Sequence, residues 1–312
     1  MAERSFAEEV KKLRAGAGDI FEGEGILAIT KALLQSGVSY VGGYQGSPIS
    51  HLMDVLNDAQ EILSELGVHF EANGSEATAA AMLSASINYP LRGAVTWKST
   101  VGTNVASDAL SNLASAGVTG GALVIVGEDY GEGSSIMQER SYAFAMKAQM
   151  WLMDPRPNLT SITEMVERGF ELSEASNTPV FYMMRIRGCH VTGEFLAKDN
   201  LAPVFNNQAP VVPQREPEKI ILPPYVYEQE REKIAQRLPA AIKFIREQKL
   251  NEHFPGHYES LGIITCGGSY NTVIRALQRQ GLADVYGNAE VPIYCMNVAY
   301  PLVPDELVEF CV

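Results

Sequence analysis

Cysteine is scarce in this chain of 312 residues, and its few copies are widely separated. The four are Cys189, Cys266, Cys295 and Cys311, and no two have the C-x-x-C spacing of a zinc or iron–sulfur site. Their scatter also argues against a disulfide framework. We therefore expect a chain that works in a reducing, cytoplasmic compartment and that holds no metal cluster of its own.

Long apolar runs and an excess of positive charge are missing as well. No run of about 18 apolar residues is present, so we expect no membrane span, and the opening MAERSFAEEVKKLR lacks the apolar core of a secretory signal. A formal net charge of -13 argues against a nucleic-acid partner. The length and the 46% of hydrophobic residues are sufficient for two domains with a sizeable core.

Strand and helix patterns alternate through the first 200 residues. After an N-terminal arm (1–20), we expect a domain over 21–200 with strands at 38–41, 68–71, 93–98, 122–127 and 179–185, and helices at 24–37, 51–66, 103–116, 143–153, 162–177 and from 76 onward. This alternation is typical of an α/β fold with a parallel sheet, which carries its site at the carboxyl ends of the strands.

The pattern changes after residue 200. Six prolines between 203 and 224 predict an extended connection, and a charged helix is expected after it, near 228–249. We assign 201–258 as a proline-rich linker with this charged helix. A second α/β unit is expected over 259–312, with strands at 261–265 and 291–297 and helices from about 270 and 304. Two strands are too few for a stable sheet, so we expect this second domain to be incomplete without a further partner.

One acidic residue, Glu76, is surrounded by small and apolar residues in the segment 70–82. A carboxyl group on such a helix would be poorly solvated and could share a proton with a bound heterocycle. The alternative is an ordinary first-turn acid that the helix dipole stabilises, after Asn73 or Ser75 caps the helix.

Glycine, hydroxyl and amide residues follow three of the expected strands. The candidate site residues among them are Tyr44, Gln45, Gly46 and Ser47 after the first strand, Ser99 and Asn104 after the third, and Asp129 after the fourth. Adjacent in a parallel sheet, these loops would line one crevice. The alternative is that such residues only form turns.

Two glycine motifs and several charged residues are weaker candidates. The Gly23-x-Gly25 pattern resembles a dinucleotide fingerprint, but it lacks the required strand before it and the acid about 20 residues later. The turn at 267–269 is a better anion site, although a plain helix cap explains it too. Lys98 could meet a carboxylate or phosphate at the crevice, although a lone lysine at a strand end is usually solvated. His190 could be a proton carrier, but we expect a structural histidine. Arg185 and Arg187 would bind an acidic group or pair with the 128–129 edge, and Trp97 and Trp151 would be core residues.

Several of these segments together resemble the 2-oxoacid:ferredoxin oxidoreductases, and among them the indolepyruvate-type α subunits. The resemblance covers about residues 21–312. Its motifs are the loop GYQGSPIS at 43–50, Ser75-Glu76-Ala77, KSTVGTN at 98–104, Glu128-Asp129 with Ser134-Ser135, and Tyr300-Pro301-Leu302. The resemblance implies that Glu76 contacts the aminopyrimidine of thiamine diphosphate and that the 44–47 loop and Asp129 meet substrate. It also implies that Ser99 and Asn104 lie at the cofactor, with Asn104 in contact with substrate or intermediate.

This chain departs from the family pattern at the glutamate and lacks some of the family's cofactor-binding segments. Gly74 and Ser75 separate Asn73 from Glu76, which leaves Glu71 as an alternative for the glutamate. The family's Gly-Asp-Gly segment for Mg²⁺ and diphosphate, and its cysteine-rich segment for 4Fe–4S clusters, have no counterpart here. The resemblance implies a pyrimidine-binding domain followed by the start of a transketolase C-terminal-like domain, with Mg²⁺, diphosphate and clusters held by other parts of an oligomeric complex.

The function that the resemblance implies is oxidative decarboxylation of a 2-oxoacid, such as an arylpyruvate. Electrons would pass to ferredoxin, with coenzyme A as a possible acyl acceptor. Two alternatives stay open from the sequence: a non-oxidative thiamine-dependent decarboxylase, and a non-catalytic assembly subunit of such a complex.

Overall fold

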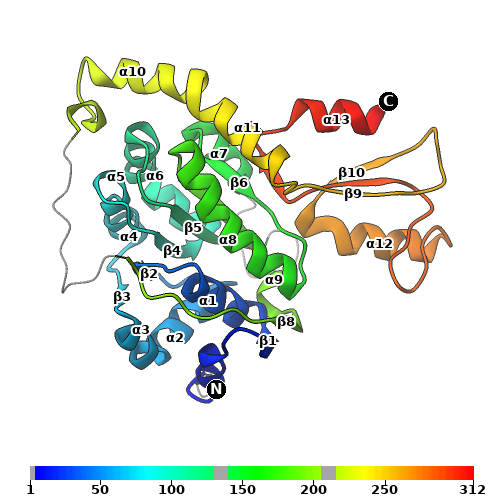
Figure 1. Cartoon of the computed structure of the whole chain (residues 1–312), viewed down its shortest axis with the longest axis horizontal. Helices are drawn as coiled ribbons and strands as arrows, with labels where there is room; N and C mark the ends of the chain where they lie inside the picture. Colours follow the sequence, from blue (N-terminus) through cyan, green and yellow to red (C-terminus); the bar gives the residue numbers. More distant parts are fainter. Residues whose placement is uncertain (1–3, 130–139, 205–215) are drawn as a thin grey trace.

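The computed structural model describes residues 4–129, 140–204 and 216–312, and in these residues a seven-stranded sheet organises the chain (Figure 1). Its strand order is β12-β6-β7-β5-β4-β2-β3. All neighbours are parallel except β12, which runs antiparallel to β6 at one edge. The strands are β2 (Tyr40–Gly43), β3 (His69–Ala72), β4 (Gly93–Lys98), β5 (Ala122–Glu128), β6 (Trp151–Met153), β7 (Val180–Arg185) and β12 (Val298–Tyr300). The expected parallel α/β class is therefore confirmed.

Helices cover both faces of this sheet, because side chains on successive residues of a strand point to opposite faces. Along β5, Leu123 and Ile125 join one apolar cluster, whereas Val124 and Val126 join another. The first face is covered by α1 (Gly25–Gln35), α2 (Ser50–Asp58), α3 (Gln60–Leu66) and α8 (Leu159–Ser176). The second is covered by α4 (Glu76–Leu83), α5 (Ala85–Asn88), α6 (Ser99–Ala116) and α7 (Ser141–Ala148).

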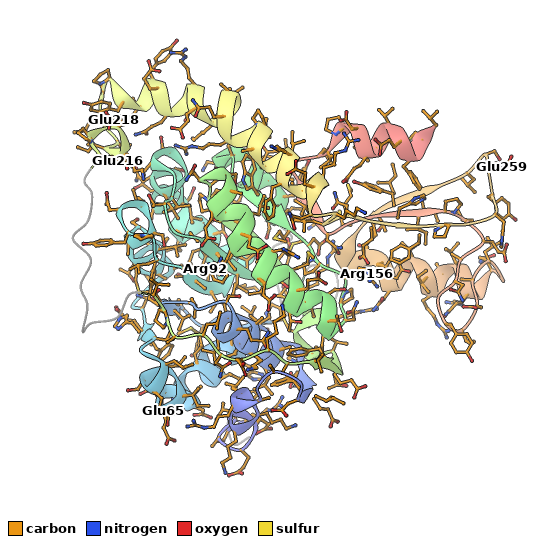
Figure 2. All side chains as sticks on the ribbon, viewed as in Figure 1. Glu65, Arg92, Arg156, Glu216, Glu218 and Glu259 are labelled. Carbon is orange, nitrogen blue, oxygen red and sulfur yellow. The ribbon has the colours of Figure 1, made fainter. Side chains whose placement is uncertain are left out.

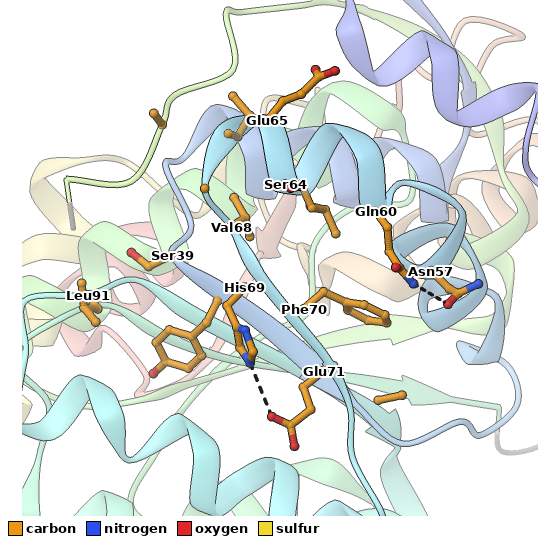
Figure 3. A pocket seen from close by; sticks show the side chains of 16 residues that line it. Ser39, Asn57, Gln60, Ser64, Glu65, Val68, His69, Phe70, Glu71 and Leu91 are labelled. Atoms are coloured by element: carbon orange, nitrogen blue, oxygen red, sulfur yellow. Dashed lines mark hydrogen bonds and ion pairs between the residues drawn. The ribbon is translucent and has the colours of Figure 1, made fainter. Parts of the chain in front are cut away.

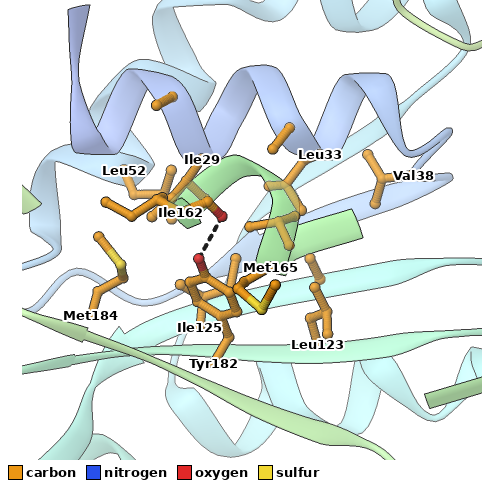
Figure 4. Packing of buried hydrophobic residues seen from close by; sticks show 14 of the residues in the cluster. Ile29, Leu33, Val38, Leu52, Leu123, Ile125, Ile162, Met165, Tyr182 and Met184 are labelled. Carbon is orange, nitrogen blue, oxygen red and sulfur yellow. Dashed lines mark hydrogen bonds between the residues drawn. The ribbon is translucent and has the colours of Figure 1, made fainter. Parts of the chain in front are cut away.

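Tyr182 lies in the centre of the first face and shows how polar atoms are accommodated there. Its ring packs among Ile125, Met165 and their neighbours, and its hydroxyl donates a hydrogen bond of 2.6 Å to the carbonyl of Ile162 (Figure 4). A buried hydroxyl without such a partner would lose its hydrogen bond to water without replacement.

The segment predicted as an N-terminal arm packs against the domain instead. Its 3₁₀ helix η1 (Glu9–Arg14) and the residues before it bury Phe6 and Leu13 completely in the main core. The strand β1 (Ile20–Glu24) follows and pairs antiparallel with β8 (Thr192–Leu196), outside the main sheet. Gly25 is required by packing, since a Cβ there would lie 2.0 Å from the Gly188 carbonyl oxygen of α9 (Ile186–His190). The expectation that no strand precedes the Gly23-x-Gly25 pattern was therefore wrong, but β1 lies outside the parallel sheet and Gly25 has a packing explanation.

The predicted linker is in part an integral helix of the first domain. After η2 (Pro217–Lys219), the chain forms α10 (Tyr225–Glu232), a π-helical turn η3 (Lys233–Arg237) and α11 (Leu238–Glu247). Arg237 is only 3% exposed and donates hydrogen bonds to the carbonyls of Ala114, Ser115 and Ala116 at the end of α6. Ala241 and Ile245 of α11 are fully buried in the main core.

The second unit shares a sheet with the first. Its own three-stranded sheet contains β9 (Glu252–Phe254), β10 (Ile263–Cys266) and β11 (Ile293–Met296), with η4 (Gly267–Ser269), α12 (Tyr270–Arg279) and α13 (Pro304–Cys311) around it. The next strand, β12, returns to the edge of the main sheet. Arg156 stands at the junction (Figure 2) and donates to Glu252 at 2.7 Å. The predicted boundary at 258 therefore does not separate two independent sheets.

Five short strands were not predicted: β1, β6, β8, β9 and β12. The helix expected over 143–153 ends at Ala148, and Trp151–Met153 forms β6 instead. The helix expected from 103 begins at Ser99. Both tryptophans are core residues, as predicted, with Trp97 at 0% and Trp151 at 2% exposure. In the described part of the chain, none of the helices is long and apolar enough to cross a bilayer.

Candidate active site

The three loops selected from the sequence lie at one edge of the sheet. The strands β2, β4 and β5 are parallel neighbours, so their carboxyl ends meet there. Lys98, at the end of β4, donates to both carboxylate oxygens of Asp129, at 3.0 and 3.1 Å. Its ammonium group also donates to the carbonyl of Ser47. The side chains of Lys98 and Asp129 are 13% and 2% exposed, so the lysine meets a carboxylate, as one expectation had it, and is not solvated.

The 44–47 loop packs closely on that ion pair. A Cβ at Gly46 would lie 2.6 Å from the Cβ of Lys98, so a larger residue would displace the loop. Gln45 donates to Asp54 at 2.8 Å, which ties the loop to α2. Tyr44 is 44% exposed beside them. The loop, Lys98 and Asp129 therefore form one connected group.

Glu76 occupies the first turn of α4, and local sequence explains its position. Ser75 caps the helix by accepting from the Thr78 N–H at 3.3 Å, and the Thr78 hydroxyl accepts from the Ser75 N–H at 3.1 Å. The helix lies on the second face of the sheet, where α4 packs on α6. Glu76 is therefore held against the first turns of α6.

The surroundings of Glu76 are apolar and narrow. Its side chain lies against Gly102 and Trp97: a Cβ at Gly102 would be 2.9 Å from Glu76 Cγ and 2.5 Å from Trp97 Cδ1. Glu76 is only 7% exposed. Among the hydrogen bonds and ion pairs of the described residues, none engages its carboxylate. The carboxylate oxygens are not among the completely buried side-chain atoms without partners, so they remain accessible to a ligand, and the first-turn position beside the helix dipole stabilises their charge.

Glu71, the alternative to Glu76, has a different environment. It lies on β3, the edge strand, beside a cavity of about 950 Å³ (Figure 3). Its side chain is 53% exposed, and its carboxylate lies 3.4 Å from His69 Nε2 and 3.3 Å from the Asn73 amide nitrogen. A solvated carboxylate with two partners is less suited to share a proton with a ligand, so the geometry favours Glu76.

Ser99 and Asn104 lie in α6 rather than in a loop. Ser99 is 3% exposed at the first position of the helix. Asn104 is exposed two residues after Gly102 and donates from its amide to the Thr100 carbonyl at 2.8 Å. Ser134 and Ser135, which the resemblance also selected, lie outside the described residues.

A second polar group, at the carboxyl ends of β5 and β7, was only partly foreseen. Arg185 pairs with Asp154 at 2.6 Å, which agrees with the expectation of an acidic partner, and its charge also acts on Glu128. Glu128 is 3% exposed and accepts from the Ser141 N–H at 3.1 Å. Burial, with a smaller contribution from the nearby negative charge of Asp154, raises the pKa of Glu128 to about 7. Asp154 was missed because it follows the unpredicted strand β6.

The turn at 267–269 and His190 also have structural partners. A Cβ at Gly268 would lie 2.3 Å from Asp154 Oδ1, so the turn before α12 already faces an anion of this chain. His190 Nδ1 lies 2.7 Å from Glu24 Oε1, near the β1–β8 ribbon. The described residues contain no cluster of three or more His, Cys, Asp or Glu side chains that could hold a metal ion.

Comparison with known proteins supports the resemblance noted in the sequence. The chain is 29% identical over 299 residues to the indolepyruvate oxidoreductase subunit IorA of Methanothermobacter marburgensis. The aligned region covers 96% of this chain and 46% of that protein. The IorA subunit of Archaeoglobus fulgidus is 24% identical over 283 residues, covering 90% of this chain and 43% of that protein. This chain thus spans about half the length of the curated relatives it matches. No family model matches the sequence.

A solved structure has the same fold. The 2-oxoglutarate:ferredoxin oxidoreductase from Magnetococcus marinus superposes with a TM-score of 0.66 at 16% identity, over 94% of this chain and 56% of that chain. At this identity the likeness concerns the fold. The sequence-based resemblance to 2-oxoacid:ferredoxin oxidoreductases, with the indolepyruvate type among them, is confirmed by these comparisons.

Proposed function

We propose that this chain is the pyrimidine-binding part of a thiamine diphosphate-dependent 2-oxoacid:ferredoxin oxidoreductase. The observation that carries the proposal is Glu76, a residue only 7% exposed beside Gly102, whose carboxylate has no hydrogen-bond or ion-pair partner among the described residues. The similarity to indolepyruvate and 2-oxoglutarate enzymes gives the reaction class. An arylpyruvate is the proposed substrate, because the relatives that cover most of this chain are indolepyruvate oxidoreductase subunits.

The residues of this chain fit an aminopyrimidine ring. Glu76 would accept a hydrogen bond from a protonated ring nitrogen and hold that proton in a poorly solvated site. The absence of a side chain at Gly102 leaves room for the Glu76 side chain against Trp97. Thiamine diphosphate, when bound, supplies a carbanion that attacks the keto carbon of a 2-oxoacid.

The loop group would orient the substrate. Ser47 is exposed, and its carbonyl is fixed by Lys98, which in turn is neutralised by Asp129. This arrangement holds the loop in place, and both Ser47 and Tyr44 are exposed on it. Binding groups on a rigid support lower the cost of orienting a substrate.

An exposed apolar surface near Glu76 supports docking of the remaining parts of the complex. Val101 and Val105 are one helical turn apart on α6, and Tyr142 and Met146 are likewise on α7, which contacts α6. These four side chains are between 40% and 52% exposed. Contiguous exposed apolar groups mark interaction surfaces. We assign Mg²⁺, the diphosphate, the iron–sulfur clusters and ferredoxin contacts to partners docked on this side.

The proposal is tested by Glu76→Gln in the complete enzyme, with Glu71→Gln as a matched control. We expect Glu76→Gln to lower turnover at least about tenfold, because the amide cannot take up the proton, and Glu71→Gln to leave turnover near the wild-type rate. Calorimetry with thiamine diphosphate and Mg²⁺ would measure binding in parallel. A loss of less than about tenfold in Glu76→Gln, or a larger loss in Glu71→Gln, contradicts the assignment.

A further inference from the structure

A cavity of about 270 Å³ lies between α7, the main sheet and the second unit. Part of its lining is apolar: Tyr142, Leu152, Met183, Met296, Ala299 and Leu302, together with Cys266. The rest is polar or charged: Glu128, Arg140, Ser141, Asp154 and Arg185. Leu152, Met183 and Ala299 are at most 5% exposed and form the floor, whereas Tyr142 and Leu302 are 40% and 43% exposed and stand at the mouth. Such a cavity offers an apolar floor to a hydrophobic group and charged side chains to the polar part of the same ligand.

The position of this cavity connects it to the candidate active site. It opens at the carboxyl ends of β5 and β7, on the face of the sheet that also carries Glu76. Glu128 and Arg185 line it, and they also line a second cavity of about 220 Å³ whose wall includes Asp129. The two cavities therefore share a wall, and together they extend from the Lys98–Asp129 pair to the apolar floor.

We propose that this cavity binds the aromatic ring of the 2-oxoacid, and that the second unit thereby determines substrate specificity. This inference rests on the proposed function. Size supports a ring: an apolar cavity of about 150 Å³ already admits benzene, so about 270 Å³ is sufficient for a two-ring group. The thioethers of Met183 and Met296 contact ring edges favourably, and Tyr142 offers an aromatic partner at the mouth.

Three of the lining residues come from the last part of the chain. Met296 ends β11, Ala299 lies in β12, and Leu302 follows it. Because β12 is hydrogen-bonded to β6 at the edge of the main sheet, these residues are held rigidly over the strands of the first domain. Substitutions in the 296–302 segment should therefore change which side chain is accepted without altering the residues around Glu76.

Two variants test this pocket, with a matched control on the same unit. Ala299→Leu fills the floor, and Leu302→Trp blocks the half-exposed mouth. Val308→Trp places the same bulky ring on α13, at a residue that is 61% exposed and does not line the cavity. In the intact complex we expect each pocket variant to raise KM for indolepyruvate roughly tenfold or more relative to KM for pyruvate, because one misplaced methylene costs about that factor in an apolar pocket. The control should leave the ratio unchanged.

A binding measurement separates this inference from the proposed function. Titration of the full chain with indole should give saturable binding that Ala299→Leu and Leu302→Trp abolish and Val308→Trp preserves. Unchanged indole binding in both pocket variants, or an equal rise in KM for both substrates, would overturn the pocket assignment. Failure of the wild-type complex to bind thiamine diphosphate would instead refute the proposed function, and the indole titration would still decide whether the cavity takes a ring.

Discussion

Glu128 gives the most quantitative prediction for this chain. Burial raises the pKa of its carboxyl from an ordinary 4.5 to about 7. As pH rises, the unfolded chain therefore releases this proton before the native protein does, and native stability falls. The stabilising effect of the raised pKa is fully present below about pH 4.5 and is lost as pH passes about 7. The difference between the two pKa values, at 1.36 kcal/mol per pH unit, corresponds to about 3.4 kcal/mol in all.

The perturbation is Glu128→Gln, which keeps an acceptor for the Ser141 N–H and removes the titrating group. About three quarters of the effect, roughly 2.5 kcal/mol, falls between pH 5 and pH 8. We therefore expect the free energy of unfolding of the variant, minus that of wild type, to be about 2.5 kcal/mol larger at pH 8 than at pH 5. Relief of the repulsion with Asp154 acts in the same direction.

The assay is urea unfolding of wild type and variant at several pH values, followed by circular dichroism. The quantity of interest is the difference in the free energy of unfolding between the two proteins, because other titrating groups cancel in it. A difference that stays constant between pH 5 and pH 8 would refute the reasoning, since it would mean that Glu128 ionises alike in the folded and unfolded chains.

Two further substitutions test how the elements are held together. Gly25→Ala should destabilise the chain by about 2 kcal/mol or more in urea unfolding, because its Cβ would lie 2.0 Å from the Gly188 carbonyl oxygen, whereas Gly74→Ala, with nothing within 4 Å, should cost little. Arg237→Met should cost about 3 kcal/mol, because it leaves buried carbonyls at the end of α6 unpaired. A variant as stable as wild type would show that the linker helix is not integral to the domain.

The sequence predicted the main parallel strands well, because their physical signal is local. The run from Ala122 to Gly127 is wholly apolar, which is typical of a strand buried on both faces. Strands β6, β8 and β9 gave no such signal. β6 has only three residues and follows α7 after two, so its apolar side chains continue the helical pattern. Its strand state depends on pairing with β7 and β12, which local periodicity does not encode.

The candidate site was predictable in its loops but not in its contacts. Polar loops after parallel strands locate the carboxyl edge of the sheet. Contact of Lys98 with a carboxylate was foreseen only as an alternative, and Asp129 was not named as its partner, because the two residues are 31 positions apart. The cavity was hidden as well, since its lining comes from α7, β6, β7, β11 and β12.

The two residues that separate Asn73 from Glu76 have a physical explanation. Asn73 is 8% exposed, and its side-chain oxygen accepts from the Gly43 N–H at 2.9 Å, while its own N–H donates to the Gly43 carbonyl. It therefore fixes the end of β3 to β2, directly before the 44–47 loop. Gly74 and Ser75 then lead the chain off the sheet edge, and Ser75 caps α4. Asn73 and Glu76 thus have separate tasks: Asn73 holds the loop, and Glu76 begins α4 with its side chain beside Gly102.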